Sequence, residues 1–311
     1  MTPLKLKPIP PSSLELLIQP QTDTTYEHFE DARNNPFDHG TDGFSRVNAW
    51  WLADAALLAY WDERSARPIW RRAGLDLTFL SEQGVQCHVA SDGRLAIVAF
   101  RGTQPNDWQD LLDIAMAAHI PYEYGGAVHR GFLGSLDRIW PRLKVVLEDL
   151  DRTGHRVWFA GHSLGAALAT LAMDRFPAAR GLYTIASPPV GNQRFARGFN
   201  RRHAGRSFRY ANHRDIVVNL PKPLLVLFGG YSHVRERRYI NGKGIISAGS
   251  TVAAWLSSLT VRKMTPSFIR GAGPTALFAL PQRLVDHTPR RYAVYIWNDY
   301  ATAQPLAAAG V

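Results

Sequence analysis

Residues 157–168 read VWFAGHSLGAAL, and this stretch is the strongest indication of the fold in the sequence. It holds Ser163 in a Gly-x-Ser-x-Gly pattern, after a short apolar run and before a run rich in alanine. The apolar run predicts a buried strand, and the alanine-rich run predicts a helix. A serine at this strand-to-helix turn is typical of a nucleophile elbow, in which glycines let the strand and the helix approach each other. A serine at an ordinary helix N-cap is the alternative, and the two glycines make it the weaker one.

Around this turn, strand and helix patterns alternate along the chain. Near-continuous apolar runs predict buried strands, and apolar residues three and four positions apart predict helices. Their order predicts right-handed crossovers and an α/β fold, with a mostly parallel central sheet and helices on both faces. The expected strands are 84–90, 94–101, 156–160, 181–186 and 207–211, and the expected helices are 48–60 (with Asn48 as N-cap), 131–150, 164–176 and 192–202.

The domain organisation follows from the absence of any stretch that reads as a linker. A single domain over residues 46–311 is therefore expected. Residues 1–45 contain many Pro, Asp, Asn and Gly and show little periodicity, which predicts an N-terminal leader packed on the surface.

Composition narrows the function classes. The 311 residues are 46% hydrophobic and 20% charged, which excludes a disordered or fibrous protein and leaves a globular one.

The formal net charge of +10 suggests an anionic partner, which could be nucleic acid, an acidic lipid surface or an acidic substrate. Seven arginines lie between residues 194 and 214 with no acid among them. No nucleic-acid recognition module accompanies them, so no nucleic-acid partner is expected. A solvated helix face explains the charge, and peripheral contact with an anionic membrane or lipid interface is the alternative.

Cysteine usage and the N-terminus bear on location. Cys87 is the single cysteine, which excludes an intrachain disulfide and a cysteine-based zinc site. Pro8, Pro10 and Pro11 interrupt the N-terminal segment, so no signal peptide is recognised. The longest uncharged apolar-leaning run, 245–261, is too short and too polar for a membrane span. A cytoplasmic or peripheral-membrane location is therefore expected.

A serine nucleophile needs a base, and the base needs an orienting carboxylate. After a nucleophile elbow these partners follow in the order acid, then histidine. The acids between Ser163 and the last histidine are Asp174, Asp215, Glu236 and Asp286. Asp215 is preferred because it lies just past the carboxyl end of a predicted strand, where ligands gather in open parallel sheets. Glu236 stands in an arginine-rich run and is the weaker alternative.

Two histidines follow Asp215, namely His233 and His287. His287 lies in a loop before a predicted helix, a setting that suits a C-terminal base, so it is the expected base. His233 precedes a predicted strand and is equally well explained as a structural histidine. The other histidines, including His162 beside the serine, are expected to be structural or exposed. No metal or organic cofactor is expected.

The oxyanion that forms when a serine attacks a carbonyl group needs hydrogen-bond donors at the same edge of the sheet. The N–H group of Leu164 is one expected donor, because it begins the helix after the serine. Thr103 is the other, because it follows the buried strand that ends near residue 101. A simple turn residue is the alternative interpretation of Thr103.

Taken together, these motifs resemble the class 3 lipase family, the fungal-type triacylglycerol lipases of the α/β-hydrolase superfamily. The resemblance implies the roles already given to the serine, the acid, the histidine and the oxyanion donors. It also implies a lid over residues 105–121, and it leaves 242–283 as a flap insertion or additional helical core. It runs over about residues 48–300 and rests on the blocks 53–60, 99–108, 128–132, 161–169, 187–192, 215–217, 231–233 and 286–292.

The expected function is that of a serine carboxylic-ester hydrolase, in the first place a lipase that cleaves acylglycerol esters through an acyl-enzyme on Ser163. A phospholipase A1, or a feruloyl or short-chain esterase, on the same fold is the alternative within this chemistry. A catalytically dead, lipase-like binding module is the alternative outside it. The apparently complete set of serine, acid and histidine argues against the dead module.

Overall fold

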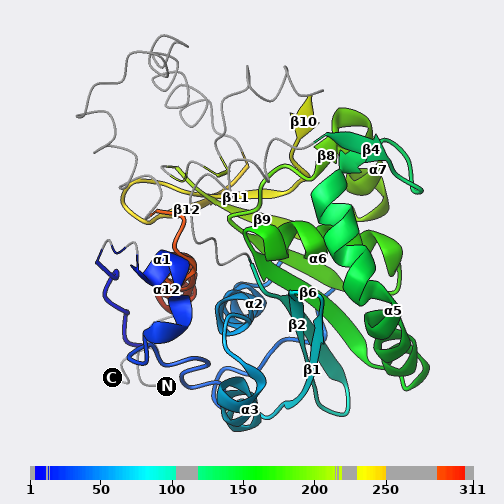
Figure 1. Cartoon of the computed structure of the whole chain (residues 1–311). Helices are drawn as coiled ribbons and strands as arrows, with labels where there is room; N and C mark the ends of the chain where they lie inside the picture. Colours follow the sequence, from blue (N-terminus) through cyan, green and yellow to red (C-terminus); the bar gives the residue numbers. More distant parts are fainter. Residues whose placement is uncertain are drawn as a thin grey trace.

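A computed structural model describes residues 4–11, 13, 15–102, 118–213, 215, 217–218, 230–249 and 286–304 (Figure 1). The helices are α1 (Glu15–Ile18), a 3₁₀ turn (Pro20–Thr22), α2 (Arg46–Leu58), α3 (Glu63–Arg72), α5 (Arg130–Arg152), α6 (Leu164–Arg175), α7 (Gln193–Arg202) and α12 (Pro289–Ala303). The strands are β1 (Asp76–Glu82), β2 (Val85–Ser91), β3 (Leu95–Phe100), β4 (His119–Pro121), β5 (Ala127–His129), β6 (Arg156–His162), β7 (Gly181–Ile185), β8 (Gly191–Asn192), β9 (Ser207–Asn212), β10 (Tyr231–Ser232), β11 (Arg237–Ile240) and β12 (Ile246–Ala248).

The described strands form a large sheet in the order β1-β2-β3-β6-β7-β9-β11-β12 and a small one in the order β10-β8-β5-β4. In the large sheet β3, β6, β7, β9 and β11 run parallel, while β1, β2 and β12 pair antiparallel toward its edges. The predicted α/β fold with a mostly parallel sheet is confirmed. The carboxyl ends of β3, β6, β7 and β9 consequently meet at one edge of this sheet.

Helices cover both faces of the large sheet, so two apolar cores form (Figure 1). On one face α2 and α12 pack together, and Trp50, Trp158 and Trp297 are almost fully buried there. On the other face α5 and α6 pack over the strands around Phe132 and Phe159. All six residues of β3 are buried, because the sheet is covered on both sides, and this explains why the sequence of β3 is apolar without alternation.

The predicted elements agree with the observed ones to within a few residues, but the start of the first long helix differs. Asn48 was expected as its N-cap, whereas α2 begins at Arg46 and Ser45 accepts the N–H of Asn48. The Asn48 side chain instead pairs with the main chain of Asp38, at 2.8 Å from both its N–H and its carbonyl oxygen. Asn48 therefore fixes the leader to the helix. A buried amide needs such partners, and the leader supplies them.

The leader over residues 1–45 is anchored by buried side chains. Tyr26, Phe29 and Phe37 are all less than 9% exposed and belong to the core beside α2. The buried carboxylate of Asp54 accepts the Tyr26 hydroxyl at 2.6 Å and the Phe29 N–H at 2.7 Å. The leader thus contributes to the core as well as covering it.

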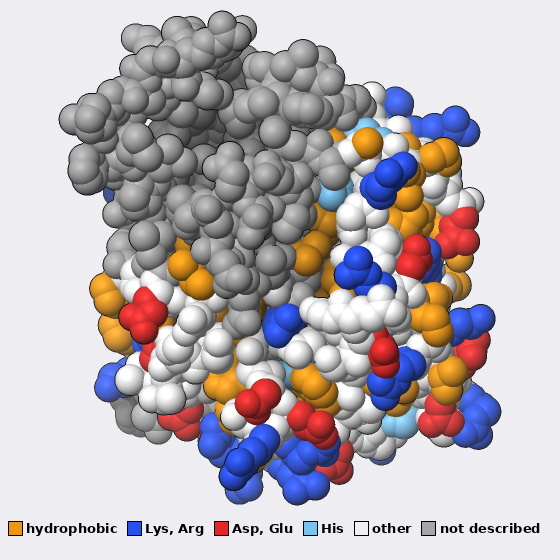
Figure 2. Space-filling model, viewed as in Figure 1, with side chains coloured by type: hydrophobic (Ala, Val, Ile, Leu, Met, Phe, Trp, Pro, Cys, Tyr) orange, Lys and Arg blue, Asp and Glu red, His pale blue; other side chains and the backbone are white. Residues whose placement is uncertain are grey.

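The arginines between residues 194 and 214 do not form one solvated face. Arg202 forms an ion pair with the buried Asp174, and Arg206 donates to the carbonyl oxygen of Ala179. Arg209 is buried, and burial lowers its pKa to about 10. The exposed members of the group that the structure describes are Arg194, Arg197, Arg201 and Arg202. On the face shown in Figure 2, basic and acidic side chains are interspersed over the described surface.

The flap expected at 242–283 and the expected absence of a membrane span can be compared only with the described residues. Residues 250–285, which make up most of the expected flap, lie outside them, and 242–249 contain a turn and β12. Among the helices that are described, none combines the length and hydrophobicity of a membrane span.

Candidate active site

Ser163 occupies the turn between β6 and α6, as the Gly-x-Ser-x-Gly pattern predicts. Its φ of 55° and ψ of −122° lie where non-glycine residues are rare. Such a conformation costs about 1–3 kcal/mol and persists only when the surrounding structure imposes it. The Ser163 N–H donates to the carbonyl oxygen of Ile185 on β7 at 3.0 Å, and the residue is 4% exposed. The strained turn therefore presents the serine at the carboxyl edge of the sheet.

The glycines on either side of Ser163 are required by close packing. A Cβ atom on Gly161 would overlap the main chain of Gly165, and a Cβ on Gly165 would overlap the carbonyl oxygen of Phe100 at the end of β3. The first turn of α6 therefore lies directly on the backbone of two neighbouring strands. This close approach is the physical reason for the glycine spacing in the sequence.

We expect Gly165→Ala to destabilise the fold by about 2 kcal/mol or more, because the added methyl meets backbone that cannot move aside. Urea denaturation followed by circular dichroism measures the loss. Gly134→Ala in α5 is the matched control, since a Cβ there meets nothing within 4 Å. That change should leave stability equal or raise it by about 0.4–1 kcal/mol. Equal stability of the two variants would contradict the packing argument.

Asp215 and His287 lie in contact although 72 residues separate them. Nδ1 of His287 is 2.8 Å from Oδ2 of Asp215, and both side chains are at most 2% exposed. Asp215 follows β9, and His287 precedes α12, so the carboxyl end of β9 and the amino end of α12 lie next to each other at this contact. The other carboxylate oxygen of Asp215 accepts the N–H of Val217 at 2.9 Å.

Tyr292 on α12 also contacts this carboxylate. Its hydroxyl donates to Oδ2 of Asp215 at 2.6 Å and accepts the N–H of Asn212 at 2.8 Å. Burial and the neighbouring Asp215 raise the pKa of Tyr292 well above its usual value, so the hydroxyl keeps its proton. In the sequence Tyr292 stood out only as part of the last block. Its position one turn into the helix after His287 was the available signal.

The geometry defines the protonation pattern of His287. An ionised carboxylate only accepts hydrogen bonds, so Nδ1 of His287 carries the proton that points at Asp215. Nε2 is buried and has no hydrogen-bond partner among the described residues. The carbonyl oxygen of His287 is 2.7 Å from Nε2 of His162, the residue directly before Ser163. The ring centroids of His162 and His287 are 4.7 Å apart, so His287 packs against the residue that precedes the serine.

The alternative acids and the alternative base are engaged elsewhere. Asp174 binds Arg202 and His203, and the exposed Glu236 lies 3.9 Å from Arg238. Asp286 lies 3.3 Å from Arg291 on α12. His233 contacts the carbonyl oxygen of Val218 at 3.1 Å, and burial followed by the charge of Arg209 lowers its pKa well below the usual value. The structural interpretation of His233 fits its contact with Val218, and the exposed position of Glu236 beside Arg238 fits its rank as the weaker alternative.

Of the two expected oxyanion donors, Leu164 lies among the described residues and Thr103 does not. Leu164 is the first residue of α6, so its N–H is one of the groups that an α-helix leaves without an internal partner. Thr103 lies outside the described residues, as does the lid region from 105 to 117. Residues 118–121 of the expected lid are described and contain β4.

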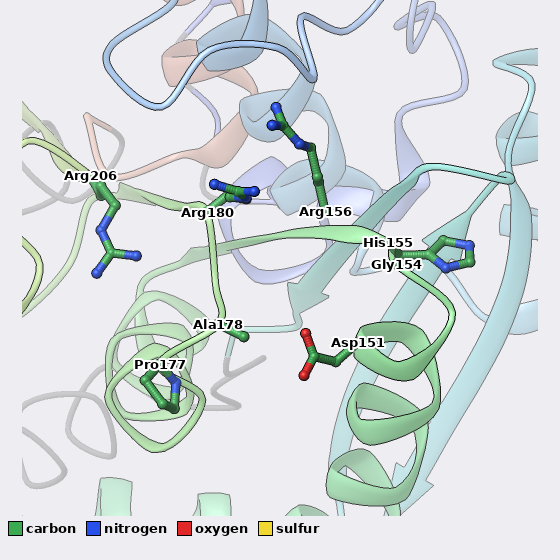
Figure 3. Close-up of a pocket in the computed structure, with 8 residues that line it drawn as sticks. All are labelled: Asp151, Gly154, His155, Arg156, Pro177, Ala178, Arg180 and Arg206. Carbon is green, nitrogen blue, oxygen red and sulfur yellow. The ribbon is translucent and has the colours of Figure 1, made fainter.

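A cavity of about 460 Å³ lies at the opposite, amino-terminal edge of the sheet (Figure 3). Arg180 there pairs with Asp42 at 3.1 Å, and Arg206 donates to a carbonyl oxygen, so its arginines are used in holding the fold. The cavity contains none of the residues singled out for chemistry. Its lining is Asp151, Gly154, His155, Arg156, Pro177, Ala178, Arg180 and Arg206.

Comparison with known proteins supports the resemblance seen in the sequence. Residues 97–224 match the family model for lipase (class 3). Over 115 residues the chain is 34% identical to secreted mono- and diacylglycerol lipase A of Penicillium cyclopium, a match that covers 32% of this chain and 35% of that protein. Over 139 residues it is 33% identical to a secreted mono- and diacylglycerol lipase of Malassezia restricta, covering 42% of this chain and 43% of that protein. The match thus spans between a third and a half of the length of these relatives.

Solved structures support the fold. The triacylglyceride lipase of Rhizomucor miehei superposes with a TM-score of 0.53 at 24% identity, over 65% of this chain and 83% of that one. Lipase II from Rhizopus niveus superposes with a TM-score of 0.52 at 24% identity, over 64% of this chain and 82% of that one. At such identities the likeness establishes the α/β-hydrolase architecture alone.

The comparisons contradict the cytoplasmic or peripheral-membrane location expected from the sequence, because the curated relatives are named secreted lipases. The expectation drawn from Pro8, Pro10 and Pro11 was therefore wrong. Residues 97–224 thus match the class 3 lipase model, this part of the chain is similar to secreted fungal lipases, and the superposed structures share its α/β-hydrolase architecture.

Proposed function

We propose that this chain is a serine carboxylic-ester hydrolase that cleaves acylglycerol esters through an acyl-enzyme. The observation that carries the proposal is the buried contact of 2.8 Å between His287 and Asp215, beside a serine held on a strained turn. A histidine with a carboxylate on one nitrogen and an unpaired second nitrogen is equipped to take a proton.

In the proposed mechanism Nε2 of His287 removes the proton from Oγ of Ser163 as that oxygen attacks the ester carbonyl carbon. Asp215 stabilises the imidazolium that forms, and it does so without leaving its buried contact. The carbonyl oxygen becomes an oxyanion, for which the N–H of Leu164 and Thr103 are the proposed donors. Collapse breaks the ester C–O bond, and the alcohol leaves with the proton from His287.

The second half of the cycle reverses these roles. Water gives a proton to His287 and attacks the acyl carbon, and Ser163 recovers its proton as the fatty acid departs.

The proposed substrate class is partial glycerides, because the matched relatives are named mono- and diacylglycerol lipases. Their names also support action outside the cell. We further propose that residues 46–311 act as one domain with the leader fixed to it. A lid over 105–121 and a flap near 242–283 complete the proposed arrangement.

Hydrolysis of p-nitrophenyl esters from C2 to C16, beside emulsions of mono-, di- and triacylglycerol, tests this function. We expect turnover that rises toward medium or long chains and release of fatty acid from partial glycerides. Turnover of short chains alone would place the protein among esterases. No turnover of any ester by folded protein would refute the proposal.

Contact with an anionic lipid interface is proposed to involve the exposed arginines of α7, namely Arg194, Arg197 and Arg201. They lie at spacings of three and four, hence on one side of the helix. We expect stronger cosedimentation with vesicles containing anionic lipid than with neutral vesicles, and a loss of this difference when all three are changed to glutamine. The matched control replaces Arg138, Arg142 and Arg152 on α5. Equal binding of the unmodified protein to both vesicle types would contradict the electrostatic contact.

A further inference from the structure

The imidazole of His162 makes two buried hydrogen bonds. Its Nε2 lies 2.7 Å from the carbonyl oxygen of His287, and its Nδ1 lies 2.8 Å from the hydroxyl of Tyr60. The sequence analysis expected His162 to be structural or exposed and predicted neither of these hydrogen bonds. His162 is 2% exposed and directly precedes Ser163.

Both protons in this chain can be assigned from chemistry. A carbonyl oxygen only accepts, so Nε2 of His162 must donate to it. Burial, followed by the charge of the neighbouring His287, lowers the pKa of His162 well below its usual value, so the ring is neutral. Its Nδ1 therefore lacks a proton and accepts from Tyr60. Burial raises the pKa of Tyr60, which keeps that hydroxyl protonated as the donor.

The two bonds join segments that are distant in the sequence. Tyr60 follows α2, and its hydroxyl fills the space that a side chain on Gly102 would occupy, at the end of β3. His162 ends β6. His287 belongs to the turn before α12, where the main chain of Asp286 has a longer bond of 3.3 Å from Asn212. The bond from His162 is thus the short main-chain contact that holds this turn against the nucleophile elbow.

We propose that His162, supported by Tyr60, is a positioning residue that holds the backbone of His287 so that its imidazole stays aligned between Asp215 and Ser163. The role rests on the proposed function of His287 as base. Without the bond, the turn would lose its shortest main-chain contact among the described residues, and the His287 ring would sample orientations in which Nε2 misses the serine. A displacement of about 1 Å at a reacting group can lower the rate 100-fold.

The test compares variants that keep or remove the donor. In His162→Gln the amide nitrogen can take the place of Nε2, whereas His162→Asn is too short to reach the carbonyl oxygen. We expect His162→Asn to lower kcat about 10- to 100-fold with KM nearly unchanged, since the side chain touches no substrate. His162→Gln should recover most of that loss, and Tyr60→Phe should lower kcat by a smaller factor.

A second readout is independent of ester hydrolysis. In protein labelled with ¹⁵N-histidine, the proton between Nδ1 of His287 and Asp215 should give a downfield resonance, assigned by its loss in Asp215→Asn. We expect this resonance to broaden or move in His162→Asn and to be retained in His162→Gln. If the protein hydrolyses no ester, the proposed function fails, and the resonance still reports whether His162 positions His287.

His88→Asn is the matched control. His88 is also fully buried, accepts from Trp70 at 3.2 Å and contacts the carbonyl oxygen of Trp61 at 3.2 Å. Its replacement should lower the melting temperature and leave kcat and the resonance as they are. Full kcat with an unchanged resonance in His162→Asn would overturn the inference, as would equal losses in the Asn and Gln variants. If His162→Asn does not fold, Tyr60→Phe decides on the same readouts.

Discussion

Replacing Ser163 by alanine is expected to lower kcat for ester hydrolysis by at least about 10⁴-fold. The hydroxyl oxygen is the proposed nucleophile, and alanine has no atom that could form the acyl-enzyme in its place. Alanine has the same Cβ as serine, so the positive φ of the turn costs the same in both proteins. The melting temperature should therefore stay close to that of the unmodified protein.

Two measurements check this result. Initial rates with a p-nitrophenyl ester give the loss of kcat, and a fluorophosphonate probe followed by mass spectrometry shows whether Ser163 is the labelled residue. Ser187→Ala is the matched control, because Ser187 is 1% exposed and follows β7 at the same edge of the sheet. Its hydroxyl donates to the carbonyl oxygen of Pro188 at 2.8 Å. Activity and labelling that persist in Ser163→Ala would rule out the proposed mechanism.

Asp215→Asn is expected to lower kcat by about 10³- to 10⁴-fold while KM changes little. A carboxylate accepts the Nδ1 proton of His287 and stabilises the imidazolium, whereas an amide is neutral and can donate. The amide therefore favours the tautomer with its proton on Nε2, which leaves no lone pair for the proton of Ser163. Rates measured over a range of substrate concentrations separate the effect on kcat from that on KM.

Glu236→Gln is the control for the choice of acid. Glu236 is exposed and lies near Arg238, so its substitution should leave kcat within about two-fold of the unmodified protein. Tyr292→Phe removes one donor to the carboxylate and should lower kcat by about ten-fold, between the two other variants. A large loss in Glu236→Gln together with full activity in Asp215→Asn would reverse the assignment of the acid.

Much of the fold was predictable because its signals are local. The apolar run of β3 reflects a strand covered on both faces, and the glycines at 161 and 165 reflect the close approach of α6 to β3 and β6. Alternation of strands and helices predicts the parallel sheet, since crossovers in such sheets have one hand. The first and last residues of the helices and strands were less predictable, as the start of α2 shows. The side chain of Asn48 had a partner in the leader, 10 residues away, that no helical pattern reveals.

The candidate active site likewise has residues that the sequence favoured and contacts that only the structure revealed. The chain order of serine, acid and histidine, and the position of Asp215 after a strand, favoured residues that the structure places 2.8 Å apart or on the elbow itself. Sequence order could not reveal Tyr292 beneath the carboxylate, or the partners of His162. Sequence patterns also failed to predict the location, because the names of the secreted relatives contradict the expected cytoplasmic or peripheral-membrane location.

The sequence pattern was enough to predict the elbow, the strands that flank it and the candidate acid and histidine that follow it along the chain. These features depend on periodicity and on glycine sterics within a few residues, which a linear pattern records. Tertiary structure alone decided which side chains meet at the carboxyl edge of the sheet. Tyr60, His162 and His287 are joined only because the ends of α2 and β6 and the start of α12 converge there, and that convergence depends on the packing of the whole domain.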